Sequence, residues 1–145
     1  MKIIHATPDH LPAVAPLFDA YRQFYRQPPD LPAALEFLGQ RLANRESVIF
    51  LALDGDEPLG FVQLYPSFSS VSLRRLWILN DLFVAPAARG RGAATALITQ
   101  ACDFARADGA KGLVLETAAD NPAQQLYERL GWQRDTDFYH YSLNL

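Results

Sequence analysis

The chain has 145 residues, half of them hydrophobic and 12% aromatic, which suits a single domain over residues 1–145 with a packed core. Its net charge of −3 argues against a general nucleic-acid binder, because such binders depend on many contacts with phosphates. The lone Cys102 excludes an intrachain disulfide, and no apolar run approaches the ~20 residues that span a bilayer. With no visible signal peptide, we expect a cytoplasmic protein that has no membrane partner.

The first half of the chain predicts two helices and a hairpin. Thr7 followed by Pro8 is a typical helix start, and apolar residues spaced by three and four continue to Phe24. Two largely apolar runs flank a hairpin turn over 54–57. The expected elements are a strand over 2–6, helices over 7–24 and 32–44, strands over 47–53 and 59–65, and a polar loop over 66–72.

The second half centres on a strand, a glycine-rich loop and a helix. The run 76–84 is apolar and β-prone, and Pro86 should end it, since proline cannot continue a ladder. The segment Arg89-Gly90-Arg91-Gly92-Ala93-Ala94 is then a loop of small residues that opens into a helix with one apolar face, beginning at Ala94. After it we expect a strand over 113–117, a short helix over 121–130 and closing strands over 132–134 and 138–143. This order predicts an α/β fold with a mixed sheet.

The glycine-rich loop is a candidate phosphate site. A helix N-terminus leaves about four amide N–H groups unpaired and carries partial positive charge. Glycine allows a ligand to approach the backbone, and Arg89 and Arg91 add formal charge, so a pyrophosphate would fit. A softened turn with two solvated arginines is the plainer alternative. A dinucleotide-binding oxidoreductase is another, but Thr95 stands where its third glycine would be.

Two motifs resemble the GCN5-related N-acetyltransferase (GNAT) superfamily. Arg89-x-x-Gly92-x-Ala94 is similar to the Arg/Gln-x-x-Gly-x-Gly/Ala signature with which that superfamily binds the pyrophosphate of acetyl-CoA. The segment from Asn121 through Tyr127 to Gly131-Trp132 is similar to its Asn-x-x-Ala-x-x-x-Tyr-x-x-x-Gly-Phe segment, with Ala123 one place early and Trp for Phe.

The resemblance implies an acyl-CoA N-acyltransferase (GNAT) fold, with a mixed, mostly antiparallel sheet of six to seven strands and about four helices. It also implies an enzyme that moves the acetyl group of acetyl-CoA to a primary amine of a small molecule, peptide or protein, by direct transfer in a ternary complex. A non-catalytic CoA-binding regulator remains the alternative.

The cofactor site implied by the resemblance combines the central strand, the loop and the second motif. A backbone N–H of Phe83 or Val84 would face the thioester carbonyl as an oxyanion-hole donor does. Asn121 is both a natural helix cap and, by the resemblance, a contact of the pantetheine arm. The expected cofactor-binding residues are Leu82, Phe83, Val84, Arg89, Gly90, Arg91, Gly92, Ala93, Ala94, Thr95, Asn121, Ala123 and Tyr127.

Three residues are candidates for proton transfer. Tyr127 aligns with the tyrosine that protonates the leaving thiolate in this family, and its phenol, with an ordinary pKa of about 10, arrives protonated. Asp81 and Glu116, on or beside neighbouring strands, are the candidate bases, with Asp81 preferred. Burial of a carboxylate among aromatics would raise its pKa toward a useful range, although Asp81 could equally bind a cationic substrate.

The acceptor is expected to be an amine held by aromatic and acidic side chains. The candidate substrate-binding residues are Tyr25, Asp30, Tyr65, Phe68 and Asp81. The histidines show no metal-ligand spacing, so we expect no metal. The aromatic-rich tail over 132–141 could supply a strand that faces a partner, so we expect a homodimer.

Overall fold

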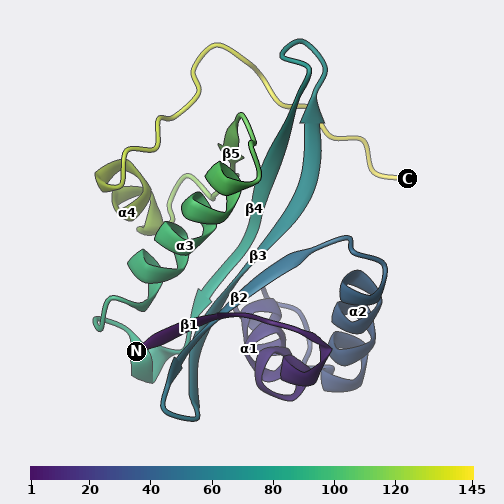
Figure 1. Ribbon diagram of the computed structural model, residues 1–145, viewed down its shortest axis with the longest axis vertical. Helices are drawn as coiled ribbons and strands as arrows, with labels where there is room; N and C mark the ends of the chain where they lie inside the picture. Colours follow the sequence, from purple (N-terminus) through teal and green to yellow (C-terminus); the bar gives the residue numbers. More distant parts are fainter.

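The computed structural model describes residues 1–145 and shows a five-stranded sheet between two layers of helices (Figure 1). The strand order is sequential from β1 to β5; the first four strands are antiparallel, and β5 is parallel to β4. The strands are β1 (Lys2–His5), β2 (Val48–Asp54), β3 (Glu57–Ser69), β4 (Arg74–Val84) and β5 (Gly112–Val114). The predicted α/β class and the mixed, mostly antiparallel sheet are confirmed.

Four α-helices and two short 3-10 turns complete the fold. Helices α1 and α2 cover one face of the sheet, and α3, with α4 beside it, covers the other. The helices are α1 (Leu11–Phe24), α2 (Leu31–Ala43), α3 (Ala93–Ala107) and α4 (Ala123–Arg129), and the 3-10 turns are η1 (Pro8–His10) and η2 (Pro86–Ala88). No helix has both the length and the apolar character needed to cross a membrane.

Local sequence explains where the first two helices start. The Thr7 side chain and the His10 ring form a reciprocal capping box ahead of α1, as the Thr-Pro pair predicts. The Asp30 carboxylate accepts a hydrogen bond from the Ala33 N–H at 3.1 Å and caps α2. Capping side chains therefore define where the chain enters each of the two helices that lie on the sheet.

A β-bulge at Asn80 decides which way the end of β4 faces. Asp81 pairs with Gln63 while Leu79 pairs with Leu64, so Asn80 is the extra residue on β4. Before the bulge, Leu79 packs in the core under α3; after it, Phe83 packs in the core under α1 and α2. The bulge thus turns Asp81 toward the α1 and α2 face.

Strand β5 supports only the first half of β4. The pairs run from Leu76 with Gly112 to Ile78 with Val114, and none follows. The sequence predicted a strand over 113–117, but Leu115, Glu116 and Thr117 are outside it. Beyond Ile78, β4 therefore has an open side, and its unpaired backbone groups there are accessible to a ligand.

Three other predictions differ from the structure. The polar loop expected over 66–72 is mostly strand, because β3 continues and pairs Ser69 with Arg74. The short helix expected over 121–130 is restricted to α4. The closing strands expected over 132–134 and 138–143 are absent, so the sheet has five strands and not six to seven. Those residues lack a neighbouring strand, and without ladder partners an apolar alternating segment does not form sheet.

Candidate active site

The loop between β4 and α3 presents a row of free backbone donors. Gly90 and Gly92 have φ of 78° and 84°, a left-handed conformation that glycine adopts at little cost. The first helical bond joins the Ala96 N–H to the Gly92 carbonyl at 3.1 Å, and no hydrogen bond within the chain uses the N–H groups of residues 90–95. Because these donors sit at the positive end of α3, the loop is suited to an anion.

The two arginines of this loop differ in their contacts. The Arg89 Nε donates to the Val84 carbonyl at 3.1 Å, which holds the loop against the end of β4. The Arg91 guanidinium pairs with the Asp54 carboxylate of the β2–β3 turn. The charge of Arg91 is thus paired with a carboxylate, whereas the amides of residues 90–95 have no partner in the chain.

The loop has room for the pyrophosphate that acetyl-CoA would bring. A Cβ placed on Gly90 or Gly92 would meet no heavy atom within 4 Å, so the space over the loop is open. The residues present therefore fit the cofactor: flexible backbone, six adjacent donors and no competing side-chain cap on α3.

The register of β4 identifies which amides face the open side. The Ala85 N–H donates to the Leu59 carbonyl at 2.8 Å, and hydrogen-bonded pairs alternate along an antiparallel ladder. Phe83 therefore pairs with β3, whereas the N–H groups of Leu82 and Val84 point away from it. Gly60, opposite Val84, permits close approach, since a Cβ there would lie 2.5 Å from the Phe83 carbonyl oxygen. Of the two amides considered from sequence, that of Val84 faces the open side of β4 and that of Phe83 faces β3.

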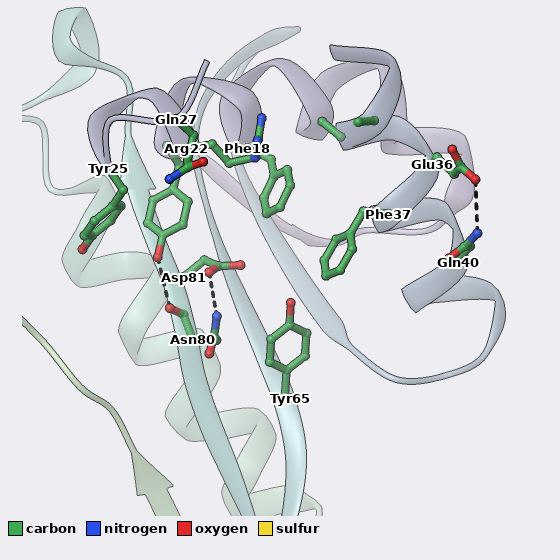
Figure 2. A pocket seen from close by; sticks show the side chains of 13 residues that line it. Phe18, Arg22, Tyr25, Gln27, Glu36, Phe37, Gln40, Tyr65, Asn80 and Asp81 are labelled. Atoms are coloured by element: carbon green, nitrogen blue, oxygen red, sulfur yellow. Dashed lines mark hydrogen bonds between the residues drawn. The ribbon is translucent and has the colours of Figure 1, made fainter. Parts of the chain in front are cut away.

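A pocket of about 680 Å³ opens between α1, α2 and the sheet (Figure 2). Asp81 and Tyr65 rise from the strands, and Phe18 and Phe37 descend from the helices opposite them. The pocket combines aromatic walls with a carboxyl group on its floor, an arrangement that suits a cation with an apolar portion. It is lined by Phe18, Tyr21, Arg22, Tyr25, Gln27, Ala33, Ala34, Glu36, Phe37, Gln40, Tyr65, Asn80 and Asp81.

Asp81 is the buried acidic group of this pocket, with only 3% of its surface exposed. Its carboxyl accepts hydrogen bonds from the Gln63 side-chain amide and from the Asn80 Nδ2, the latter at 2.9 Å. Burial raises the pKa of Asp81, and the polar contacts with Gln63, Asn80 and Tyr21 oppose the rise. A carboxylate with a raised pKa, open to a pocket, is well placed to accept a proton.

Tyr21 and Tyr65 flank Asp81. The Tyr21 hydroxyl donates to the Asn80 carbonyl at 3.3 Å, on the bulge. Burial raises the pKa of Tyr21 far above its ordinary value, and the charge of Asp81 adds to the rise. Burial also raises the pKa of Tyr65, to about 12, again with a contribution from Asp81. Both phenols are protonated donors over the physiological range.

Tyr127 lies on α4, half-buried against Trp132, with ring centroids 5.8 Å apart. Burial raises the pKa of the Tyr127 phenol, and the neighbouring Tyr25 adds to the rise. Tyr25 lines the pocket, whereas Tyr127 is outside the lining.

The ends of α4 fix the position of Tyr127. The Asn121 Oδ1 accepts from the Ala123 N–H at 2.9 Å, but the N-cap of the helix is Pro122, one residue after the predicted cap. At the other end, the Gly131 N–H reaches the Glu128 carbonyl and the Trp132 N–H reaches the Tyr127 carbonyl, a Schellman motif.

The structure brings some predicted residues together and separates others. Asp81, Tyr25 and Tyr65 share the pocket. Glu116 is exposed in the segment after β5, away from the pocket lining. Asp30 is a helix cap, and Phe68 is 70% exposed, 4.7 Å under the Arg75 guanidinium.

Three polar residues around Asp81 were not singled out from sequence: Tyr21, Gln63 and Asn80. The helical spacing of apolar residues predicts that Tyr21 packs on the inward face of α1, and this pattern does not indicate a contact for its hydroxyl. Gln63 is 0% exposed on a strand that otherwise reads as core. A fully buried amide within an apolar strand is the only sign that a polar partner lies opposite.

The fold and site together define a CoA-dependent acyltransferase, and comparisons with known proteins agree. Residues 12–132 match the model of the Acetyltransferase (GNAT) family. The chain is 51% identical to "Uncharacterized N-acetyltransferase YhfO" of Bacillus subtilis over 146 residues, covering 100% of this chain and 98% of that protein. It is 36% identical to a "Probable acetyltransferase" of Haemophilus influenzae, over 88% of this chain and 97% of that one.

A solved structure agrees over the full length. The crystal structure of a probable acetyltransferase, 45% identical, superposes with a TM-score of 0.94 and covers 100% of this chain and 98% of that one. The chain therefore belongs to the GNAT acetyltransferase family and is an N-acetyltransferase. Enzymes of this family use acetyl-CoA.

Proposed function

We propose that this enzyme transfers the acetyl group of acetyl-CoA directly to a primary amine bound in the pocket between α1, α2 and the sheet. One observation carries the proposal: β4 holds buried Asp81 in the pocket and leads, a few residues later, to the free amides of residues 90–95. A proton acceptor and an anion cradle thus lie along one continuous segment.

Each reacting group has a residue suited to it. Acetyl-CoA, when bound, supplies an acetyl thioester, and the residues 90–95 would hold its pyrophosphate. The Val84 N–H, free on the open side of β4, would stabilise negative charge on the carbonyl oxygen. Asp81 would take a proton from the ammonium form of the substrate, directly or through water, and Tyr127 would give its phenolic proton to the leaving thiolate.

The pocket supports an amine with an apolar or aromatic portion. Tyr21, Tyr25 and Tyr65 surround Asp81, and Phe18 and Phe37 extend the apolar wall. An ammonium group beside Asp81 would gain from the carboxylate and from the ring faces. Small-molecule amines and peptide amines both meet this description.

We also propose a cytoplasmic homodimer. The single Cys102, which leaves no intrachain disulfide, supports a reducing compartment. The dimer is supported by the tail that follows Trp132, whose large apolar side chains are exposed.

Thermal unfolding with and without acetyl-CoA is the first test, with NADH as the control nucleotide. Acetyl-CoA at about a hundred times its Kd should stabilise the fold by roughly 2.7 kcal/mol, and NADH should leave the melting temperature unchanged. No shift with millimolar acetyl-CoA would overturn the cradle.

Turnover is measured on the same samples as thiol release with a panel of alkyl and aryl primary amines. Release that depends on the amine supports acetyl transfer. Tight acetyl-CoA binding without release from any amine would favour a CoA-binding regulator.

A further inference from the structure

Gln63 on β3 is a fully buried amide, and only one of its two polar atoms has a partner. The Nε2 donates to the Asp81 Oδ2, whereas the Oε1 is buried and accepts no hydrogen bond within the chain. Buried amide oxygens in folded proteins are nearly always hydrogen-bonded, because desolvation without a partner costs stability. The unpaired oxygen beside Asp81 therefore points to a second state of the site in which that oxygen is used.

The β3–β4 ladder fixes Gln63 in this place. Gln63 is the cross-strand partner of Asp81, at the bulge where the register shifts. Its neighbours on β3, Val62 and Leu64, pack in the core under α3, so alternation directs Gln63 to the opposite face, toward α1 and α2. The amide thus lies on the pocket side of the sheet, and Asp81 is its one hydrogen-bond partner there.

The contacts of Asp81 in the structure are those of an ionised carboxylate, which accepts hydrogen bonds and cannot donate one. The Gln63 Nε2 donates to the Oδ2, and the Asn80 Nδ2 donates to the Oδ1 at 2.9 Å (Figure 2). Each carboxylate oxygen therefore has a donor in this state, and the Gln63 Oε1 has no donor to accept from.

The transfer of a proton to Asp81 changes what its carboxyl group needs. In the proposed reaction an N–H bond of the substrate ammonium breaks, its electron pair stays on nitrogen, and an O–H bond forms at Asp81. The neutral amine then uses that electron pair to attack the thioester, so it can no longer accept from the new O–H. The O–H needs another acceptor, but the Gln63 Nε2 that faces it is a donor.

We propose that Gln63 is a positioning residue whose amide rotates by half a turn when Asp81 gains a proton. Its Nε2 donates to the ionised carboxylate, and after the rotation its Oε1 accepts from the carboxylic acid. Asp81 gives the proton to water when the product leaves, and the amide rotates back. Both charge states of Asp81 are thereby hydrogen-bonded by the same side chain. This inference rests on the part that the proposed function gives to Asp81.

Asn80, the other amide that contacts Asp81, is not constrained in the same way. Its side chain is exposed, so water can pair with either end of its amide in both charge states of Asp81. Gln63 is 0% exposed and has no such access to solvent. The orientation of the Gln63 amide should therefore follow the charge of Asp81.

Other ionisable groups face or adjoin the pocket from the elements around it. These are Tyr21, Arg22 and Tyr25 on α1, Glu36 and Arg41 on α2, Tyr65 on β3 and Tyr127 on α4. Burial raises the pKa of Tyr21 and of Tyr65, so both stay protonated, and Arg22 pairs with Asp19 at 3.2 Å. Glu36 is exposed and accepts from the Gln40 Nε2 at 3.4 Å. A titration of this pocket must therefore separate Glu36 from Asp81.

The first test follows the Gln63 side chain by NMR in protein containing isotope-labelled glutamine, titrated between about pH 9 and about pH 4 without substrate. Gln63→Met identifies the Gln63 resonances by their absence. As Asp81 becomes protonated, the side-chain NH2 protons should move upfield, because they lose the carboxylate. The Cδ carbon should move downfield at the same pH, because its oxygen gains a hydrogen bond. A fixed amide would show the first change without the second.

Two controls assign the change to Asp81. In Asp81→Asn both steps of the Gln63 resonances should vanish, because residue 81 no longer ionises. Gln40 is the matched amide in wild type, since its Nε2 also donates to a carboxylate. Gln40 is exposed, so water can pair with its oxygen in either state, and its Cδ should show no downfield step. A Gln63 Cδ that does not move, or that moves equally in Asp81→Asn, overturns the inference.

Turnover tests whether the rotating amide acts through Asp81. Gln63→Met keeps the length of the side chain and removes its donor and acceptor, so kcat should fall about 10-fold with acetyl-CoA affinity unchanged. In an Asp81→Asn background the same substitution should cause no further loss, because no proton is taken up there. A further loss in that background would make the role of Gln63 structural and overturn the inference. Thermal unfolding shows that each variant folds, and Gln133→Met, on an exposed residue, controls for the substitution itself.

The inference and the proposed function fail in different experiments. The NMR titration needs neither acetyl-CoA nor an amine. If Asp81→Asn loses the acid limb of its pH profile while the Gln63 Cδ stays fixed, only the rotation is overturned. If Asp81→Asn keeps full turnover, the part of Asp81 in the reaction is overturned, and the positioning role of Gln63 with it, even where the amide rotates.

Discussion

The loop that would hold the cofactor and the pocket that would hold the acceptor are built in opposite ways. The loop uses the backbone of six consecutive residues, 90–95, and needs little more from side chains than that they be small. The pocket uses side chains from α1, α2, β3 and β4, which are far apart in the chain. A ligand common to a family can be bound by backbone, whereas an acceptor particular to one enzyme needs side chains that vary.

The two regions also differ in how their polar groups are satisfied. The N–H groups of the loop have no hydrogen-bond acceptor within the chain and are therefore free to bind a ligand. Asp81 already accepts hydrogen bonds from Gln63 and Asn80. Its suitability as a proton acceptor therefore comes from burial, which raises its pKa, and not from a missing hydrogen-bond partner. Substitutions in the loop should therefore alter cofactor affinity, and substitutions in the pocket should alter turnover.

The largest effect is expected from Gly92→Glu. The glutamate strains a backbone with φ of 84° and brings negative charge to the amides, so acetyl-CoA affinity should fall at least about 100-fold. Isothermal titration with acetyl-CoA measures it. Gly109→Glu is the matched control, since φ there is 74° and the site is at the opposite end of α3. Equal loss in both variants would mean that strain, and not the cradle, explains the result.

Asp81→Asn should lower kcat roughly 100- to 1,000-fold and leave acetyl-CoA affinity unchanged, because a proton acceptor is lost from the pocket while the loop is untouched. Thiol release against pH is the measurement. In wild type, activity should fall as the pH drops through the raised pKa of Asp81, and the variant should lack this acid limb. An unchanged acid limb would assign the proton acceptor to another group.

Tyr127→Phe tests whether the Tyr127 phenol donates a proton to the leaving thiolate. Loss of the phenolic proton should lower kcat by roughly 10- to 100-fold with acetyl-CoA affinity intact, because the ring still packs on Trp132. Tyr25→Phe, on the adjacent pocket wall, is the control for loss of a hydroxyl alone. If the two variants lose activity equally, Tyr127 has no special part in proton donation.

Much of the loop could be predicted from the sequence because its cause is local. A strand that ends before proline, two glycines and an apolar helical face are all short-range signals, and they predicted a helix opening from this loop, where α3 begins at Ala93. The caps at Thr7 and Asp30 are signals of the same local kind.

The pocket could be predicted only in part because its cause is long-range. The bulge at Asn80 arises because Gln63 and Leu64, seventeen and sixteen residues earlier, pair with the residues on either side of it. No feature of the β4 sequence predicts it. Glu116 was a candidate because the strand was expected to continue to it, but β5 ends at Val114 and pairs with β4 only as far as Ile78. Closing strands were also expected over 132–134 and 138–143, but a residue's preference for strands reports a tendency to pair and not the presence of a partner.

The smallest predicted effect concerns stability and rests on the same Asp81. Its pKa is raised in the folded protein, so the folded state binds its proton more tightly than the unfolded state does. Its contribution to stability is therefore fully present below the unfolded pKa and is lost as the pH rises through the folded pKa. Asn cannot ionise, and its amide can donate to the Gln63 Oε1, which has no partner in wild type.

Asp81→Asn should thus be more stable than wild type at neutral pH, and the difference should shrink as the pH falls toward 4, where both states of wild type become protonated. Urea unfolding at several pH values measures this dependence, with Asp9→Asn, on an exposed turn before α1, as the control. A stability difference that does not change with pH would show that the variant acts through packing. Combined with the turnover of the same variant, a pH-dependent difference would mean that the burial which prepares Asp81 for proton transfer also costs the fold stability.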